Sequence, residues 1–363
     1  MLSDHMFSQD RLFVDIETQF LQHTNSGHFQ FIKGTATNLD HTQRIVTITL
    51  ESSGTTQGIS FHGLVIATGA STASPLLGLI KDETLLRQCW SSLRKAMPGV
   101  KNIVISGGGP AGIEAAGELG EHFNGRPGTF RSRLSAHQVN ITVITSNSKI
   151  LPNLREAIAA KAEKLLAGVG VTVVKNARVK TVIPVGAGID PELLTSKTTV
   201  VLEDGKSIDA DLYIPATGTT PNTDFISDKC LLAADSRIDT NPSTLRVDRA
   251  GPNARIYAIG DASSYARPAI HNILSAVPVL CTSMKDDLLL EEGYQKDLSA
   301  RAGKVFVEDT RETQLVPIGT RKGVGAAMGL QLPGLMIWML KGRDYWLWTT
   351  GNLWNGKKWD RES

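Results

Sequence analysis

Asn102-Ile103-Val104-Ile105-Ser106-Gly107-Gly108-Gly109-Pro110-Ala111-Gly112 is the stretch that decides the fold of this 363-residue sequence. Its first four residues, with the apolar run Ile103-Val104-Ile105, predict a strand. The Ala- and Glu-rich segment 113–123 has the composition of a helix, and residues 140–144 form the next predicted strand. A Gly-x-Gly-x-x-Gly turn between a strand and a helix predicts a βαβ unit that binds a dinucleotide.

Each glycine of this turn has its own predicted role. Gly107 allows the tight turn, Gly109 lets the backbone approach a pyrophosphate, and Gly112 permits close packing of the helix on the strand. The unpaired N–H groups at the start of the helix would face the phosphates. The alternative is a glycine-rich turn that binds no ligand, and the strand–turn–helix context favours the binding site over it.

The end of the second strand bears on the choice between NADH and NADPH. A site selective for NAD has an Asp or Glu there, which bonds the ribose hydroxyls. This sequence has Thr145-Ser146-Asn147-Ser148-Lys149 instead, with no acid. Lys149 could contact a 2′-phosphate, which favours NADPH or the use of either cofactor. The alternative is that Lys149 is a solvated surface residue.

Two further features lie outside the glycine-rich turn. The sequence Ala-Thr-Gly occurs twice after an apolar run, at residues 67–69 and 216–218, which indicates an internal repeat. Residues 255–259 predict a strand that ends in Gly260-Asp261. An Asp at the carboxyl end of a strand can accept hydrogen bonds from the hydroxyls of a ligand. The alternative for Asp261 is a helix N-cap, but the combination with the two Ala-Thr-Gly turns and the glycine-rich turn favours the ligand role.

Composition excludes several functional classes. Lys and Arg total 38 against 36 Asp and Glu, a net charge of +2, which excludes a protein that binds nucleic acid mainly through its phosphates. Cys89, Cys230 and Cys281 lie far apart and form no Cys-x-x-Cys pair, which argues against a zinc site or a redox-active dithiol. With no signal peptide and no apolar run of the ~20 residues that span a bilayer, we expect a cytoplasmic protein.

Taken together, these motifs are similar to those of the flavoproteins with two dinucleotide-binding domains, the pyridine nucleotide–disulfide oxidoreductase family. The two Ala-Thr-Gly turns, the glycine-rich turn and Tyr257-Ala258-Ile259-Gly260-Asp261 carry the resemblance. The chain most resembles the apoptosis-inducing-factor-like branch, which includes the ferroptosis-suppressor quinone reductase, since Gly323-Val324-Gly325 and the Trp-rich end are similar to the C-terminus of that branch. The missing Cys-x-x-Cys argues against the disulfide reductases of the family.

The resemblance implies an FAD site and an NAD(P)H site. FAD would be contacted near Ala67, Thr68 and Gly69, and its ribityl chain by Asp261, which follows Gly260. The NAD(P)H pyrophosphate would sit over the turn that begins at Gly107, at Gly109, Pro110 and Gly112.

Two more elements are implied to lie at the nicotinamide end. Glu114 would lie near the nicotinamide side, on the helix after the turn. Thr217 and Gly218 would approach the nicotinamide cofactor.

The predicted fold is α/β, with two Rossmann-like dinucleotide-binding domains and a small C-terminal α+β domain. We expect an FAD domain at residues 1–72 and 214–300, an inserted NAD(P)H domain at 73–213 and the C-terminal domain at 301–363. The family's first glycine-rich loop, which holds the FAD pyrophosphate, does not occur in this sequence. The FAD domain is therefore expected to be incomplete on its N-terminal side.

The predicted function is an FAD-dependent NAD(P)H oxidoreductase that passes electrons to an acceptor, with a quinone as the favoured acceptor. One alternative is a truncated or non-catalytic NAD(P)-binding or interaction protein that has lost FAD. Another is a biosynthetic flavin oxidoreductase that acts on a specialised metabolite.

The Trp-rich C-terminus suggests peripheral contact with a membrane or packing within the protein or a homodimer. Trp338, Trp346, Trp348, Trp354 and Trp359 lie close to Lys and Arg residues, a combination that suits a bilayer interface. The alternation of Trp346 and Trp348 predicts a strand.

Overall fold

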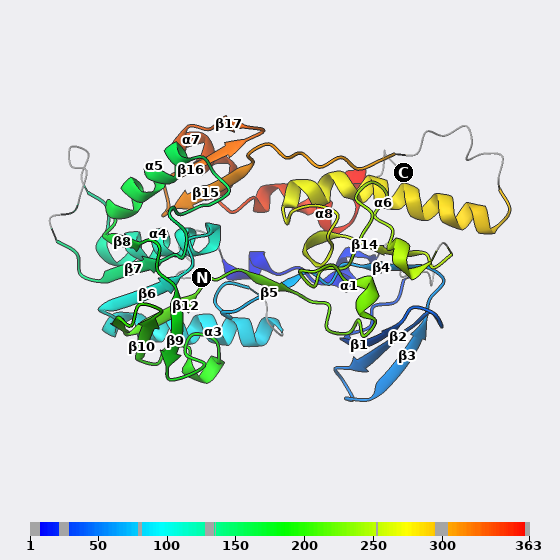
Figure 1. The fold of residues 1–363 in the computed structure, drawn as a ribbon, viewed down its shortest axis with the longest axis horizontal. Coiled ribbons are helices and arrows are strands. Elements are labelled where there is room, and N and C mark those ends of the chain that lie inside the picture. Colours follow the sequence, from blue (N-terminus) through cyan, green and yellow to red (C-terminus); the bar gives the residue numbers. More distant parts are fainter. Residues whose placement is uncertain are drawn as a thin grey trace. The chain divides into compact units, whose positions relative to one another are not determined.

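The computed structural model describes residues 8–21, 29–78, 82–127, 134, 136–251, 253–294 and 304–359. The chain divides into two compact units (Figure 1). Unit 1 contains residues 1–13, 71–219 and 310–350, and unit 2 contains residues 14–70, 220–309 and 351–363. Two short strands, β5 (Ala70–Thr72) and β13 (Thr219–Pro221), lie where the chain passes from one unit to the other.

Unit 1 is built on a parallel sheet of four strands in the order β12-β6-β7-β8, which is the order of a Rossmann-like domain. The strands and the helices that follow β6 and β7 are β6 (Asn102–Ser106), α4 (Pro110–Asn124), β7 (Asn140–Ile144), α5 (Glu156–Ala167), β8 (Val171–Val174) and β12 (Leu212–Pro215). The predicted βαβ unit is confirmed, with β7 parallel to β6.

Two layers cover this sheet, one on each face, because its side chains alternate between two apolar faces. Ile103 and Ile105 of β6 pack with the buried faces of α4 and α5, whereas Val104 packs against the antiparallel sheet β11-β10-β9. Figure 1 shows the helices and this second sheet on opposite sides of the parallel sheet. The strands of the second sheet are β9 (Val179–Ile183), β10 (Thr198–Leu202) and β11 (Ser207–Ala210).

The other elements of unit 1 lie before β6, between β9 and β10, and after residue 310. They are η1 (Gln9–Leu12), α3 (Glu83–Ala96), η2 (Met97–Gly99), η3 (Pro191–Leu193), β15 (Gln314–Ile318), β16 (Lys322–Ala327), β17 (Leu330–Gln331), α7 (Gly334–Ile337), the π-helical turn η7 (Trp338–Gly342) and η8 (Leu347–Thr349). Strands β15, β16 and β17 form an antiparallel sheet.

Unit 2 contains a parallel pair of strands, β4 and β14, and an antiparallel sheet in the order β1-β2-β3. One face of β14 packs on the long helix α6, through Tyr257 and Leu280. The elements are α1 (Ile16–Gln19), β1 (Gly34–Asp40), β2 (Ile45–Leu50), β3 (Thr56–Ser60), β4 (Leu64–Ile66), η4 (Lys229–Leu231), η5 (Asp248–Ala250), β14 (Ile256–Ala258), η6 (Gly260–Ala262), α6 (Ile270–Glu291), α8 (Gly351–Trp354) and η9 (Lys357–Trp359).

The division of the chain differs from the expected one at its N-terminal end and in its C-terminal part. Residues up to 13 belong to unit 1 and not to the same unit as the rest of the expected FAD segment 1–72. Residues 310–350 belong to unit 1 and residues 351–363 to unit 2, and the expected boundary at residue 300 lies outside the described residues. Gly117 of α4 explains why residues 310–350 belong to unit 1, because a Cβ on Gly117 would lie 2.8 Å from Cγ2 of Ile318 on β15. The helix and β15 therefore approach closely enough to share one core, which also includes Val316 and Val324.

The expected strand at Trp346 and Trp348 does not form. Trp346 has a φ of 68°, and residues Leu347–Thr349 form a 3-10 helix. A left-handed residue breaks the extended conformation that a strand requires.

Candidate functional site

Gly107 and Gly112 are required by the packing of unit 1 itself. Gly107 has a φ of 127°, and a Cβ there would lie 2.0 Å from the carbonyl oxygen of Ala216. A Cβ on Gly112 would lie 2.1 Å from the carbonyl oxygen of Gly107. The turn is further held by the Gly107 amide, which donates to the carbonyl of Ile144 at 2.8 Å. Any larger residue at either position would displace backbone atoms.

Gly109 differs from these two glycines, because a Cβ there would meet no protein atom within 4 Å. It is the N-cap of the 15-residue helix α4, and no side chain caps the helix at this end. The first amides of α4 that can donate are those of Ala111 and Gly112, since Pro110 has no N–H. The open space beside Gly109 and the uncapped helix end together suit an anionic group.

A cavity of about 600 Å³ lies at the carboxyl edge of the parallel sheet, over this turn. It brings together two of the predicted regions, the glycine-rich turn and Thr217-Gly218. The strands explain this, since Ala216 follows β12 and its amide donates to the Ser106 carbonyl at the end of β6 at 2.7 Å. The lining residues are Thr72, Leu77, 106–111, 144–147, 177–179 and 215–219.

Lys149 does not line this cavity. Its side chain is half-buried, and its Nζ donates to the carbonyl oxygen of Leu154. The structure therefore engages the Lys149 side chain with the backbone outside the lining of the cavity. The cation that does line the cavity is Arg178, which the sequence analysis did not single out.

Glu114 lies one turn into α4 and forms a close ion pair with Lys341. The Lys341 Nζ lies 2.5 Å from Oε1 of Glu114, and the two side chains are only 21% and 18% exposed. The Nζ also donates to the Leu315 carbonyl at 3.2 Å. Burial raises the pKa of Glu114 above its ordinary value, and Lys341 offsets this only in part. Lys341 projects from the π-helical turn η7, a conformation often found at functional sites.

In unit 2 the predicted FAD-binding residues come together at one edge. Strands β4 and β14 are parallel neighbours, and the Ile259 amide donates to the Ile66 carbonyl at 3.0 Å. Ala67 and Gly260, which follow these two residues, thus begin adjacent turns. Gly260 has a φ of 77°, which favours glycine, and Asp261 after it is half-buried.

Asn222 fixes the Ala67-Thr68-Gly69 turn, a role that the sequence analysis did not predict. Its side-chain Nδ2 donates to the Thr68 carbonyl at 2.9 Å, and its amide donates to the Gly69 carbonyl at 3.0 Å. The Thr68 hydroxyl donates in return to the Asn222 carbonyl at 2.8 Å. The turn is therefore ordered by the protein alone.

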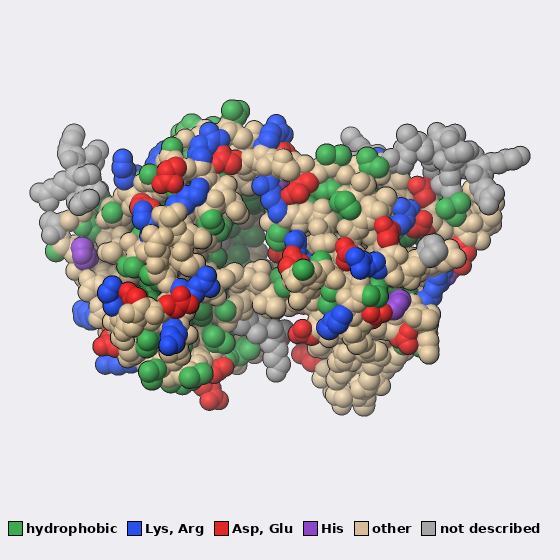
Figure 2. Space-filling view, viewed as in Figure 1, with side chains coloured by type: hydrophobic (Ala, Val, Ile, Leu, Met, Phe, Trp, Pro, Cys, Tyr) green, Lys and Arg blue, Asp and Glu red, His purple; other side chains and the backbone are tan. Residues whose placement is uncertain are grey.

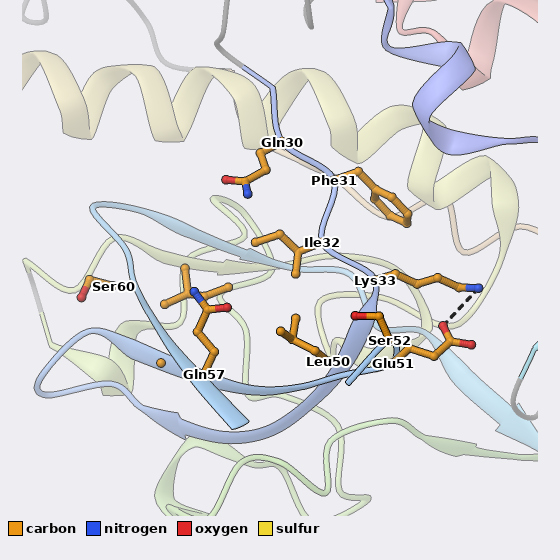
Figure 3. Close-up of a pocket in the computed structure, with 11 residues that line it drawn as sticks. Gln30, Phe31, Ile32, Lys33, Leu50, Glu51, Ser52, Gln57 and Ser60 are labelled. Atoms are coloured by element: carbon orange, nitrogen blue, oxygen red, sulfur yellow. Dashed lines mark ion pairs between the residues drawn. The ribbon is translucent and has the colours of Figure 1, made fainter. Parts of the chain in front are cut away.

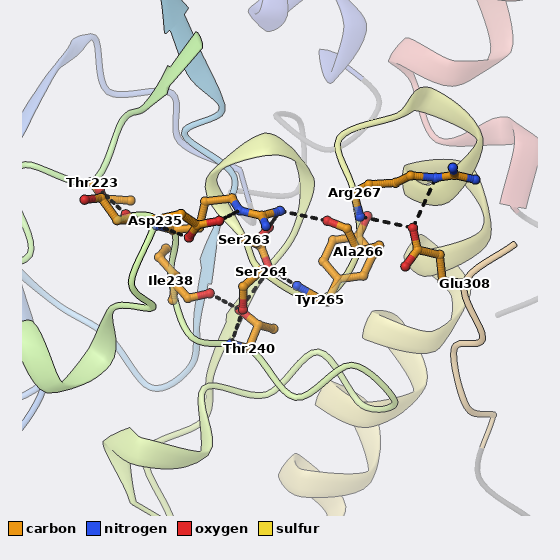
Figure 4. Close-up of polar contacts among 12 residues, drawn as sticks. Thr223, Asp235, Ile238, Thr240, Ser263, Ser264, Tyr265, Ala266, Arg267 and Glu308 are labelled. Carbon is orange, nitrogen blue, oxygen red and sulfur yellow. Dashed lines mark hydrogen bonds and ion pairs between the residues drawn. The ribbon is translucent and has the colours of Figure 1, made fainter. Parts of the chain in front are cut away.

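The segment after Asp261 is held by a buried polar network (Figure 4). The Ser263 hydroxyl donates to Thr240 Oγ1 at 2.8 Å, and the Thr240 hydroxyl donates to the Ile238 carbonyl at 2.8 Å. Arg237 adds a hydrogen bond of 2.9 Å to the Ala266 carbonyl. Satisfied buried networks of this kind are rigid, so the backbone that carries Asp261 is held in place.

Unit 2 contains a larger cavity, of about 880 Å³, beside its antiparallel sheet (Figure 3). Residues 30–33, 50–52 and 57–60 line it, and none of the residues predicted to bind a cofactor is among them. Its ion pair, Lys33 to Glu51 at 3.1 Å, is 69% and 50% exposed. This cavity is therefore large, but the ion pair that lines it is too exposed to be held in place for a ligand.

Figure 2 shows Lys and Arg interspersed with Asp and Glu on the face in view, as expected from the net charge of +2. Among the residues that the structure describes, no group of His, Cys, Asp and Glu is arranged as a metal site. No helix within the described ranges has the length and apolar composition to cross a bilayer.

Comparison with known proteins identifies a family and several relatives. The family model described as "Pyridine nucleotide-disulphide oxidoreductase" matches residues 6–278. "Oxidoreductase phnG" of Penicillium herquei is 56% identical over 363 residues, which is 100% of this chain and 85% of that protein. "Ferroptosis suppressor protein 1" of Xenopus tropicalis is 24% identical over 90% of this chain and 79% of its own length.

A solved structure gives the same fold. A pyridine nucleotide-disulfide family oxidoreductase from Enterococcus faecalis superposes with a TM-score of 0.56 at 16% sequence identity. The match covers 80% of this chain, and the chain spans 60% of the length of that solved chain. The fold is therefore the α/β fold with two Rossmann-like domains that the motifs predicted.

Proposed function

We propose, from the premise that this chain belongs to the pyridine nucleotide-disulphide oxidoreductase family, that it is a flavin-dependent oxidoreductase that takes hydride from NAD(P)H. FAD and NAD(P)H are the cofactors of that family. One observation carries the proposal: a single cavity at the carboxyl edge of the Rossmann-like sheet joins the glycine-rich turn to Thr217 and Gly218. A dinucleotide requires both a phosphate cradle and a neighbouring surface for its nicotinamide end.

The residues of unit 1 divide the work of binding between them. The open side of Gly109 and the first free amides of α4 would hold the pyrophosphate. Thr217 and Gly218 would position the nicotinamide end, at the carboxyl end of the neighbouring strand β12. Glu114 and Lys341 would form a fixed ion pair close to the start of α4, and because their charges are opposite the pair has almost no net charge. No acid or base is required for transfer of a hydride, so we assign no proton to be moved in that step.

The residues of unit 2 fit one part of an FAD site. Asp261 and the Ala67–Gly69 turn follow parallel neighbours, and a carboxylate there suits the hydroxyls of a ribityl chain. The parallel sheet described in this unit has the two strands β4 and β14, and no Gly-x-Gly-x-x-Gly motif occurs in the sequence segments of this unit. When bound, FAD supplies the acceptor for the hydride.

For the second substrate we propose a quinone. The support is the resemblance of the motifs to the apoptosis-inducing-factor-like branch, together with the similarity to ferroptosis suppressor protein 1. A specialised metabolite is the second candidate acceptor, and the fungal oxidoreductase with the higher identity, 56% against 24%, has a name that specifies no substrate. Peripheral membrane contact through the Trp-rich C-terminus and a homodimer stay predictions.

The visible absorption spectrum of the purified chain tests this function directly. The spectrum is recorded before and after addition of FAD, and again after anaerobic addition of NADPH or NADH. A flavin spectrum that bleaches on addition of the reduced nucleotide supports the oxidoreductase, and a panel of water-soluble quinones and other acceptors should then reoxidise it. A chain that retains no flavin, yet binds the nucleotide, would support the non-catalytic binding protein instead.

A further inference from the structure

The cavity over the glycine-rich turn has one feature that the proposed function does not use. Among the described residues that line it, Arg178 is the only one with a charged side chain. Arg178 immediately precedes β9 and follows the loop that leaves β8. It is 65% exposed, so its guanidinium can reach a ligand in the cavity.

Backbone hydrogen bonds place Arg178 beside the segment where NAD-selective sites have their acid. The Asn176 amide donates to the Asn147 carbonyl at 3.1 Å, and the Ala177 amide donates to the Thr145 carbonyl at 3.0 Å. The loop after β8 therefore runs alongside the loop after β7. Both loops contribute to the cavity, through Ser146 and Asn147 on one side and Ala177 and Arg178 on the other.

The order of the strands indicates which end of the cavity would hold the nicotinamide and which would hold the adenosine. In the order β12-β6-β7-β8, Thr217 lies beyond the pyrophosphate turn on one side and Arg178 on the other. A dinucleotide whose pyrophosphate lies at Gly109 and whose nicotinamide lies at Thr217 extends its adenosine toward β7 and β8. The adenosine ribose would thus meet Ser146, Asn147 and Arg178.

Charge favours a phosphate on that ribose. None of the residues that line this cavity has a carboxylate, whereas Glu203 and Asp204 line a smaller cavity that shares Ser146, Ala177 and Arg178 with it. The partner of Arg178 is Glu203, whose Oε1 lies 3.8 Å from Nε with a side chain that is 60% exposed. An exposed ion pair at this distance contributes little to stability. The Arg178 guanidinium can therefore leave Glu203 for the stronger, bidentate contact that a phosphate offers.

We propose that Arg178 binds the 2′-phosphate of NADPH and makes NADPH the preferred hydride donor. This inference rests on the proposed function, because it assumes that the cavity binds a nicotinamide dinucleotide. Lys149, the residue that the sequence suggested, is held by the Leu154 carbonyl and is assigned no part in it.

Calorimetric titration of the purified chain with two redox-inactive fragments tests the assignment. ADP-ribose and 2′-phospho-ADP-ribose differ only in the phosphate, so their relative affinity reports Arg178 whether or not flavin is bound. We expect the 2′-phosphorylated fragment to bind about tenfold to a hundredfold more tightly, the range of charge-assisted hydrogen bonds. Arg178→Gln should abolish this preference and leave the affinity for ADP-ribose unchanged.

Two variants serve as matched controls. Lys180→Gln removes an exposed cation two residues away that does not line the cavity, and Lys149→Gln removes the alternative candidate. Both should keep the preference. Equal binding of the two fragments by the unmodified chain, or a preference that survives Arg178→Gln, would overturn the assignment. Failure of the chain to bind either fragment would instead refute the proposed function.

Discussion

Replacement of Lys341 by Met would leave the Glu114 carboxylate on α4 without its ion pair. The Nζ–Oε1 distance of 2.5 Å and the exposures of 21% and 18% describe a pair that is mostly removed from water. Loss of one partner from a buried pair costs ~3–5 kcal/mol, because the other charge remains buried. Since both side chains keep some contact with solvent, we expect the low end, about 3 kcal/mol at about pH 8. For a unit of this size that lowers the Tm by about 8 °C.

The loss of stability caused by Lys341→Met should depend on pH, and the direction in which the pKa of Glu114 is displaced decides whether the loss grows or shrinks as the pH rises. Burial raises the pKa of this carboxyl above its ordinary value of 4.5. Folding therefore favours the protonated form of Glu114. The stability that this form contributes is fully present below about pH 4.5 and is lost as the pH rises through the pKa of Glu114 in the folded state. Without Lys341 that pKa rises further, so the deficit of the variant is fully developed at about pH 8 and shrinks toward about pH 5.

Thermal unfolding of the variant and the unmodified chain at the two pH values measures the effect. Lys322→Met is the matched control, since Lys322 is an exposed residue on the neighbouring strand β16. The double variant Glu114→Gln with Lys341→Met should recover most of the Tm, because no buried charge remains. A deficit of equal size at both pH values, or an equal loss in the Lys322 control, would refute the assignment of the cost to the Glu114 carboxylate.

The remaining predictions separate folding from cofactor binding. Gly109→Val should keep the Tm but weaken NAD(P)H binding more than about a hundredfold by calorimetry, because its side chain enters only the ligand's space; unchanged affinity would rule out a pyrophosphate there. Gly112→Ala should lower the Tm, since its Cβ would lie 2.1 Å from the Gly107 carbonyl oxygen; a fully stable variant would contradict this contact. Asp261→Ala should lower the flavin content of the purified chain, and equal content would leave Asp261 a purely local role.

The glycine-rich turn could be predicted from sequence because its determinants are local. The turn, the strand before it and the helix after it lie within residues 102–124. The predicted tight turn at Gly107 and close packing at Gly112 are both confirmed by backbone contacts. The two Ala-Thr-Gly segments were also recognisable, since each directly follows an apolar strand that has a parallel partner.

Residues joined only by tertiary structure could not be predicted in this way. Lys341 and Glu114 are 227 positions apart, and Asn222 and Thr68 are 154 apart. No periodic pattern relates such positions, because their contact depends on how whole elements pack. Arg178 was missed for a related reason: it becomes part of the cavity only because β8 lies beside β7, an order that the sequence does not state.

The strands that neighbour the two Ala-Thr-Gly segments carry different chemistry, and this argues for two separable sites. Beside the turn at Gly218, the neighbouring strand β6 ends in the glycine-rich turn and an uncapped helix, whose free amides suit a phosphate. Beside the turn at Gly69, the neighbouring strand β14 is followed by Gly260-Asp261, whose carboxylate suits the hydroxyls of a ligand. Amides at Gly109 and a carboxylate at Asp261 cannot exchange roles, since one set donates and the other accepts. Each repeat should therefore lose its own ligand, and only that ligand, when its residue is replaced.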